Sequence, residues 1–249
     1  MKKHIPNTLT LLNLFCGCCS IVCILNGQYT EGAIFTGISL GADFLDGFAA
    51  RMLRVNSLLG VQLDSLADMV SFGVVPGVIV FDLLKGYNNS PNIAGWQLSP
   101  ASALSLSTIP AFIITLFSCL RLAKFNIDTR QTTSFIGFNT PSNTVFFTGL
   151  MLTVQFDTLG LAHFVSNPLF LYTLIPVSSY LLVSEIRMFS MKGGLNKMKI
   201  LYIGLSLLLL ILFREVALSL NMILYVLFNM VNNFFYNKLS PVSDRTSHS

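Results

Sequence analysis

Four aspartates in one short stretch are the residues of this chain whose type and spacing could do chemistry. They are Asp43, Asp46, Asp64 and Asp68, and they make up four of the 11 acidic residues in the whole sequence. The residues around them are apolar enough for a membrane, where a charged side chain at the bilayer centre costs about 2.5–3.5 kcal/mol. Four carboxylates would therefore oppose insertion by about 10 kcal/mol or more unless something neutralises them. We expect this stretch to be a binding site.

The spacing predicts that these aspartates lie on two helix faces. The first face follows the pattern i, i+3, i+4, i+7, i+8 and consists of Asp43, Asp46, Gly47, Ala50 and Arg51. The second face has steps of four, four and three residues and consists of Gly60, Asp64, Asp68 and Ser71. A short turn around Asn56 and Ser57 would make the two helices antiparallel neighbours. All four carboxylates would then converge near one membrane surface.

The donor set indicates which ligands such a site would take. Hard oxygen ligands without His or Cys suit Mg²⁺, Mn²⁺ or Ca²⁺ rather than zinc. Four carboxylates are enough for two divalent ions that share ligands, an arrangement that clamps phosphoryl groups. Gly47, Ala50 and Gly60 leave room for a phosphate-bearing ligand to approach the backbone, and the forked donors of Arg51 suit phosphate. The pattern predicts a metal-assisted phosphoryl-group site.

Two other interpretations start from the same residues. Small residues also serve helix packing in membranes, with the aspartates paired to Arg51 and Arg54, but two arginines cannot neutralise four carboxylates. Intramembrane carboxylates also mark ion pathways, which would make the protein a divalent-cation transporter. Below Asp43 and beyond Ser71 both helices become mostly apolar, so the sequence predicts no polar path onward.

Composition predicts an all-α, polytopic membrane bundle that positions these faces. The chain has 249 residues, 53% hydrophobic and 10% charged, whereas a soluble domain has about 25% charged residues. We expect about eight spans in one domain at 1–236, with a polar, disordered tail at 237–249. The expected spans are 8–25, which ends at the turn signal Asn26-Gly27, then 31–52, 59–84, 101–123, 141–156, 169–189, and two helices within 200–235 that turn at Arg214 and Glu215.

The basic residues predict the orientation of the bundle. Of the 15 Lys and Arg residues, only Lys85 and Arg214 fall on the side opposite the two termini. The positive-inside rule then places both termini and the acidic stretch at the cytoplasm. Because the basic residues are dispersed among apolar spans, the net charge of +4 does not indicate nucleic-acid binding.

The acidic stretch resembles the signature of a known family. Its spacing, D-x2-D-G-x2-A-R-x8-G-x3-D-x3-D from Asp43 to Asp68, matches that of the CDP-alcohol phosphatidyltransferase family at every fixed position. The resemblance implies a six-helix membrane core in which the signature spans the second and third helices. It also implies transfer of a phosphatidyl group from a CDP-linked lipid to an alcohol, with release of CMP.

The same resemblance implies roles for individual residues. Asp43, Asp46 and Asp64 would be ligands of two ions, Mg²⁺ or Mn²⁺, and Asp68 would complete the set and act as general base. The residues that would bind the CDP-lipid donor are Asp43, Gly47, Ala50, Arg51, Gly60 and Asp64.

A second resemblance concerns the acceptor alcohol. The segments 5–17, 63–73 and 121–126 are similar to phosphatidylserine synthases of bacteria and archaea. The third reads RLAKFN where that group usually has RLARFN, and 137–142 reads GFNTPS where a GLPxPxA-type segment is typical. The resemblance implies CDP-diacylglycerol and L-serine as substrates, a homodimer, and a bacterial-type cytoplasmic membrane as location.

An amino-acid acceptor needs an anion partner for its carboxylate, and this requirement indicates three candidate residues. Arg121 and Asn126 could supply the carboxylate contacts, with Ser71 as a further acceptor contact. Arg121 could instead bind lipid phosphate or serve only as a topology charge. A related enzyme such as a phosphatidylglycerophosphate synthase remains an alternative, but a phosphorylated acceptor would ask for several basic residues, and this region offers mainly Arg121 and Lys124.

Overall fold

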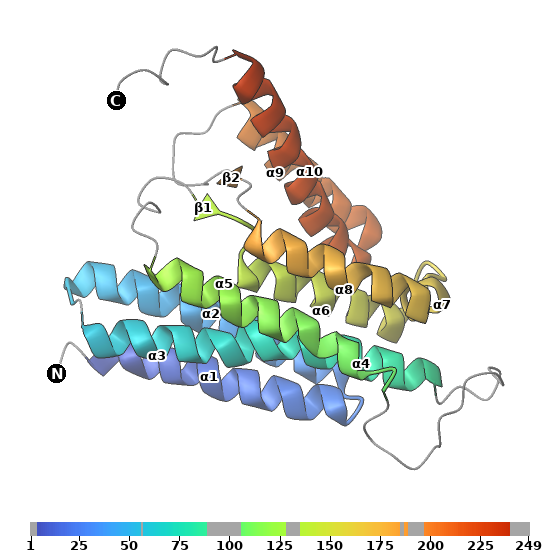
Figure 1. Ribbon diagram of the computed structural model, residues 1–249, viewed down its shortest axis with the longest axis horizontal. Helices are drawn as coiled ribbons and strands as arrows, with labels where there is room; N and C mark the ends of the chain where they lie inside the picture. Colours follow the sequence, from blue (N-terminus) through green and yellow to red (C-terminus); the bar gives the residue numbers. More distant parts are fainter. Residues whose placement is uncertain are drawn as a thin grey trace.

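Two long antiparallel helices, α1 (His4–Leu25) and α2 (Tyr29–Leu53), form one side of the molecule (Figure 1). The computed structural model describes residues 4–55, 57–88, 106–127, 135–184, 187–188 and 197–239. The chain reverses at the predicted turn, where Gly27 has a φ of 73°, a conformation that glycine adopts without steric cost. Helix α1 starts before the predicted residue 8, because Pro6 fits into the first turn of a helix.

One continuous helix follows and runs through the centre of the bundle. It consists of α3 (Leu58–Asp68), the π-helical segment η1 (Met69–Val74) and α4 (Val75–Asn88). Ser57 caps its start, because the Ser57 hydroxyl oxygen accepts a 2.9 Å hydrogen bond from the Gly60 N–H. In the most apolar part of this helix 72% of the residues are buried, compared with 22% for α2, so the other helices surround its α4 part.

The π-helical segment η1 was not predicted, and it begins directly after Asp68. The hydrogen bonds of a π-helical segment span five residues instead of the four of an α-helix, and such segments are often found at functional sites. Because of this segment, side chains after Asp68 point in other directions than they would in an uninterrupted α-helix. Ser71, Phe72 and Gly73 of this segment are all buried.

The second half of the chain adds the remaining helices. They are the 3-10 turn η2 (Ile109–Phe112) with α5 (Ile113–Ile127), then α6 (Thr140–Phe156), the short α7 (Ala162–Val165), α8 (Pro168–Val183), α9 (Lys197–Phe213) and α10 (Val216–Leu239). Each of the eight expected spans thus corresponds to a helix in the described part of the chain, although the start of the span expected at 101–123 falls on residues 101–105, outside the described residues, and its helix begins at Ile109. Helix α10 reaches into the expected tail as far as Leu239, and residues 240–249 lie outside the described residues.

The span expected at 169–189 was wrong at its end, because α8 stops at Val183. Ser184 has an extended backbone (φ −64°, ψ 146°), and the strand β2 (Arg187–Met188) then pairs antiparallel with β1 (Phe135–Ile136). The N–H of Phe138 also donates to the carbonyl of Leu181, at 3.1 Å. These backbone bonds join the end of α8 to the segment before α6.

The apolar core lies around α4. Buried residues of this helix pack with side chains from α5, α6 and α8, among them Val75, Ile79, Leu84, Ile114, Phe147 and Leu171. One acidic residue of α4 was overlooked in the sequence, namely Asp82, which is buried and accepts a 2.6 Å hydrogen bond from the hydroxyl of Tyr29. This bond joins α4 to the start of α2, at the end of the bundle opposite the aspartate stretch.

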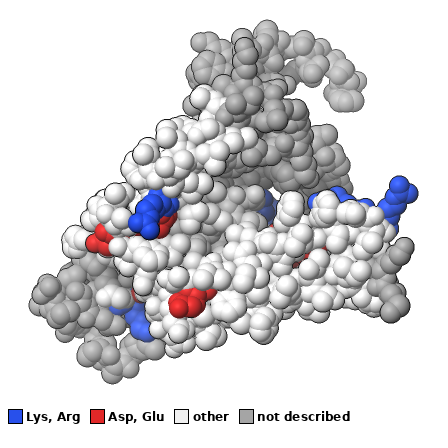
Figure 2. All heavy atoms as spheres, turned by 180° about the vertical axis from the view of Figure 1, so that it is seen from behind, with Lys and Arg blue, Asp and Glu red and all other residues white. Residues whose placement is uncertain are grey.

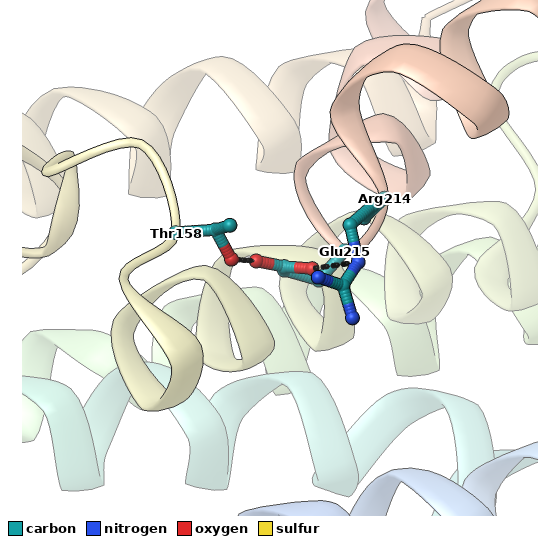
Figure 3. A network of polar contacts seen from close by, with 3 residues as sticks. All are labelled: Thr158, Arg214 and Glu215. Atoms are coloured by element: carbon teal, nitrogen blue, oxygen red, sulfur yellow. Dashed lines mark hydrogen bonds and ion pairs between the residues drawn. The ribbon is translucent and has the colours of Figure 1, made fainter.

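Helices α9 and α10 form an antiparallel pair, and α10 of this pair packs on α6 (Figure 1). The Ser219 hydroxyl donates to the carbonyl of Phe146 at 2.8 Å, and a Cβ on Gly149 would lie 2.7 Å from the Ser219 nitrogen, so the helices meet closely there. The predicted turn is confirmed, with Arg214 at a φ of 46°. Figure 3 shows Glu215 between its ion-pair partner Arg214, at 3.9 Å, and Thr158, whose hydroxyl donates to the Glu215 carboxylate.

The surface and the helix lengths are those of a polytopic membrane protein. Among the described residues, four helices are long and apolar enough to cross a membrane: His4–Leu25, Tyr29–Leu53, Leu58–Gly86 and Ile109–Ile127. Shorter apolar helices are Pro168–Val183, Leu201–Phe213 and Val216–Met230. In the view from behind, the described surface carries only scattered charged side chains (Figure 2). Large apolar side chains such as Phe15, Phe44 and Leu116 are exposed, as expected where lipid replaces water.

Candidate active site

The predicted convergence of the acidic helix faces is confirmed for three of the four aspartates. Asp43 on α2 and Asp64 and Asp68 on α3 each offer a carboxylate oxygen, and these oxygens lie within 4.8 Å of one another. Asp46, on the same helix face as Asp43, is buried and bonds to α1. Helix α1 packs against both α2 and α3, whereas α2 and α3 make few direct contacts with each other. Helix α1 therefore holds α2 and α3 in place, and the carboxylates of these two helices meet in the space between them.

The geometry of this cluster fits a hard divalent cation. Oxygen ligands lie about 2.0–2.6 Å from Mg²⁺ or Ca²⁺, so two ligands on opposite sides of one ion are separated by about 4–5 Å. The three carboxylate oxygens lie within 4.8 Å of one another and are therefore close enough to share one ion. No described Lys or Arg nitrogen lies within 4.0 Å of the four aspartate carboxylates. The interpretation of the stretch as arginine-paired helix packing is therefore not supported by the described residues.

The guanidinium of Arg51 lies over Gly47. A Cβ on Gly47 would be 3.5 Å from one of its terminal nitrogens. The guanidinium thus lies along the helix face that carries Gly47, and it forms no ion pair with the aspartates in the described part of the chain.

A cleft of about 120 Å³ adjoins the cluster. It is lined by residues of all three helices and of the α2–α3 turn, namely Pro6, Asn7, Thr10, Asp46, Gly47, Ala50, Val55, Ser57, Gly60, Val61 and Asp64. The three small residues predicted to leave room for a ligand all lie in it. At Gly60 a Cβ would be 3.0 Å from the Ser57 hydroxyl oxygen and 3.3 Å from Oδ1 of Asn7, so any side chain there would occupy the cleft.

Two residues on α1 that bond to the aspartates were missed by reasoning from the sequence. The hydroxyl of Thr10 donates to Oδ2 of Asp46 at 2.6 Å, and Nδ2 of Asn13 donates to Oδ1 of Asp68 at 3.1 Å. A hydrogen bond to a charged group contributes about 1.5–3 kcal/mol. The available signal was their spacing, because Thr10, Asn13, Gly17 and Ser20 follow steps of three, four and three and form one buried, polar face of an otherwise apolar helix.

The three acceptor candidates have different partners in the structure. Arg121 is buried on α5, where its Nε donates to the carbonyl of Phe138 at 2.5 Å and its charge interacts with Asp68. The Ser71 hydroxyl is buried and donates to the carbonyl of Asn13 at 3.1 Å. Asn126 is exposed, and its Nδ2 donates to the Ser65 hydroxyl at 2.8 Å. Of the three, Arg121 is the one with an interaction to the carboxylate cluster.

Comparison with known proteins identifies the family. The model of the CDP-alcohol phosphatidyltransferase family matches residues 3–176, a range that holds the cluster, the cleft and α1 through most of α8. The chain belongs to the CDP-alcohol phosphatidyltransferase family. Enzymes of this family generally depend on a divalent metal, in agreement with the cluster of Asp43, Asp64 and Asp68.

Several curated relatives are similar to much of the chain. A CDP-diacylglycerol–serine O-phosphatidyltransferase of Helicobacter pylori is 31% identical over 236 residues, which cover 92% of this chain and 91% of that protein. A protein of the same name from Bacillus subtilis is 30% identical over 191 residues, covering 74% of this chain and 89% of the relative. An archaetidylserine synthase of Methanothermobacter thermautotrophicus is 26% identical over 160 residues, covering 64% and 62%.

Proposed function

We propose that this protein transfers the phosphatidyl group of CDP-diacylglycerol to the hydroxyl of L-serine, producing phosphatidylserine and CMP for phospholipid synthesis. The observation that carries the proposal is the convergence of three carboxylates from α2 and α3 beside a cleft lined by small residues. Family membership supports the transfer from a CDP-linked donor, and the names of the relatives from H. pylori and B. subtilis support serine as acceptor.

The roles proposed for the four aspartates are those that the family resemblance implies, and they agree with carboxylate chemistry. Asp43, Asp46, Asp64 and Asp68 would hold two divalent ions, Mg²⁺ or Mn²⁺. When bound, such ions would neutralise the diphosphate and stabilise the departing CMP. Asp68 takes the proton from the serine hydroxyl as the serine oxygen bonds to the phosphorus that carries diacylglycerol. The bond from this phosphorus to the oxygen of CMP breaks, so CMP leaves with the bonding electrons.

The donor's CDP group is proposed to bind at the cleft beside the cluster. Gly47, Ala50 and Gly60 line this cleft, and a nucleotide diphosphate can approach the backbone closely where no side chain intervenes. Arg51, whose guanidinium lies over Gly47, would bind a phosphate oxygen of the donor through its forked donors. Asp43 and Asp64 would bind the same diphosphate indirectly, through metal ions that the aspartates hold.

The serine carboxylate is proposed to bind Arg121, with Asn126 and Ser71 as further acceptor contacts. The choice of Arg121 is supported by its burial and its interaction with Asp68. An arginine at this place would bind the carboxylate of serine while the serine hydroxyl reaches Asp68, the proposed base. Lys124, the other basic residue of this part of α5, is exposed. One buried cation suits a zwitterionic amino acid better than the phosphate dianion that a phosphatidylglycerophosphate synthase would bind.

We further propose that the site and both termini face the cytoplasm of a bacterial-type membrane, and that the protein is a homodimer. The orientation rests on the excess of basic residues on the side of the termini. The described residues do not favour cation transport, because the helix continues from Asp68 through the buried apolar residues Val75 and Ile79, and the next acidic residue, Asp82, is bonded to Tyr29.

One assay tests the function. Purified protein in detergent–lipid micelles is given CDP-diacylglycerol, Mg²⁺ or Mn²⁺, and one alcohol from a panel of serine, glycerol 3-phosphate and inositol 1-phosphate, and CMP and lipid products are measured. We expect phosphatidylserine and CMP in equal amounts with serine. Asp68→Asn, which removes the proton acceptor at nearly constant shape, should abolish turnover. Activity with glycerol 3-phosphate but not with serine would overturn the assignment of the acceptor.

A further inference from the structure

Asn13 is fully buried on α1, and it lies at the centre of a hydrogen-bond network that joins four parts of the chain. Its Nδ2 donates to Oδ1 of Asp68 at 3.1 Å, and its Oδ1 accepts a 2.5 Å bond from the hydroxyl of Ser39 on α2. Its backbone carbonyl accepts a 3.1 Å bond from the hydroxyl of Ser71 in η1. The side chain is thus held from the α2 side while it reaches toward Asp68.

The chemistry of the partners determines how the Asn13 amide is oriented. An ionised carboxylate only accepts hydrogen bonds, so the amide must present its NH₂ group to Asp68. Oδ1 then faces Ser39, whose hydroxyl can donate to it. Without the Ser39 hydroxyl, Oδ1 of Asn13 would lose its 2.5 Å partner, and the side chain could move from the position in which it reaches Asp68. Asp68 thus selects the orientation of the amide, and Ser39 holds the Asn13 side chain in it.

The network depends on a close approach between α1 and η1. A Cβ on Gly17 would lie 2.2 Å from the Ser71 hydroxyl oxygen and 2.9 Å from the Ser71 Cα, so only glycine allows this spacing. Ser71 lies in the π-helical segment that follows Asp68. The approach of Gly17 to Ser71 brings Asn13, one helical turn earlier on the same face, within reach of Asp68.

We propose that Asn13, held by Ser39, is a positioning residue for Asp68. The inference rests on the proposed function, in which Asp68 is the base. Asp68 faces two like charges, Asp43 and Asp64, which favour rotation of its carboxylate away from the cluster. By donating to Oδ1, Asn13 holds the carboxylate in place and leaves its other oxygen for the ions and the attacking hydroxyl. Because Asn13 is fully buried, it acts through Asp68 and not on the substrates.

The test compares three variants with the wild-type protein in the assay for phosphatidylserine. Asn13→Leu removes the donor and keeps similar volume, and Ser39→Ala leaves Asn13 but removes the bond that holds it. The matched control is Ser20→Ala. Ser20 is also fully buried, about two turns along the same face of α1, where its hydroxyl donates to the Gly32 carbonyl at 2.9 Å and pairs with Thr36 at 2.8 Å. This control removes a buried α1–α2 hydrogen bond that has no link to the carboxylates.

We expect Asn13→Leu to lower kcat by about 10- to 100-fold, as is typical when a partner of a metal-binding side chain is removed. KM for serine and for CDP-diacylglycerol should stay close to wild type. Ser39→Ala should show the same pattern with a smaller loss. Ser20→Ala should keep the wild-type kcat, even where its thermal unfolding temperature falls as far as that of Ser39→Ala.

Three results would overturn the proposal: wild-type kcat in Asn13→Leu, an equal loss of kcat in Ser20→Ala, or a rise in KM without a change in kcat. If Asn13→Leu does not fold, Ser39→Ala decides alone, because it removes a single hydroxyl. Failure of the proposed function is a separate result, since the wild-type protein would then produce no phosphatidylserine.

Discussion

Replacing Gly17 with alanine should disrupt the active site without touching a catalytic residue. The new Cβ would lie 2.2 Å from the Ser71 hydroxyl oxygen and 2.9 Å from its Cα. Rotation of the Ser71 side chain can relieve the first contact but not the second, because the Cα belongs to the backbone of η1. Carbon atoms in contact are about 3.5–4.0 Å apart, so α1 and η1 would have to separate by about 0.6–1.1 Å.

This displacement is large compared with the tolerance of the hydrogen bond that Asn13 donates to Asp68. The bond measures 3.1 Å, and N–H···O bonds extend to about 3.2 Å. A hydrogen bond to a charged group contributes about 1.5–3 kcal/mol, which corresponds to about 10- to 100-fold in rate if it supports the transition state. The overpacking should also lower the free energy of unfolding by about 1–3 kcal/mol.

The assay is the rate of phosphatidylserine formation at saturating serine and CDP-diacylglycerol, together with thermal unfolding in the same detergent. Gly37→Ala is the matched control, because nothing lies within 4 Å of a Cβ at Gly37 on α2. The control should keep full activity, and the better helix propensity of alanine should stabilise it by about 1 kcal/mol. Folded Gly17→Ala protein with wild-type kcat would refute the reasoning, and so would an equal loss in Gly37→Ala.

Two further predictions concern the cleft and the metal ions. Gly60→Ala places a Cβ 3.0 Å from the Ser57 hydroxyl oxygen and 3.3 Å from Oδ1 of Asn7. We therefore expect KM for CDP-diacylglycerol to rise by about 10-fold, which corresponds to about 1.4 kcal/mol, and KM for serine to stay unchanged. A rise in both KM values would contradict a donor-specific cleft. Removal of divalent ions with a chelator should abolish activity, and Mg²⁺ or Mn²⁺ should restore it. The same ions should raise the unfolding temperature of the wild type more than that of Asp64→Asn, and an equal rise in both proteins would exclude Asp64 as a ligand.

The positions of the helices and of the acidic faces could be predicted because they depend on short stretches of sequence. The turn at Asn26-Gly27 and the turn at Arg214 follow from residues that interrupt long apolar segments. The end of α8 could not be predicted in this way. Nothing in the local sequence at Ser184 ends a helix, but the Ser184 backbone is extended and the strand at 187–188 pairs with β1, a partner about 50 residues earlier in the chain.

By itself, the sequence determined that this protein is a bundle of membrane helices with a phosphoryl-transfer signature on the second and third of them. Apolar length and i, i+3, i+4 spacing are local properties, and they are enough to predict that Asp43, Asp64 and Asp68 share a site. Only the tertiary structure decided that α1 lies against both acidic helices and supplies Thr10 and Asn13 to them. The physical reason is that Asn13 and Asp68 are separated by 55 residues. Their contact depends on a glycine-mediated helix approach and on a π-helical turn, and local spacing indicates neither.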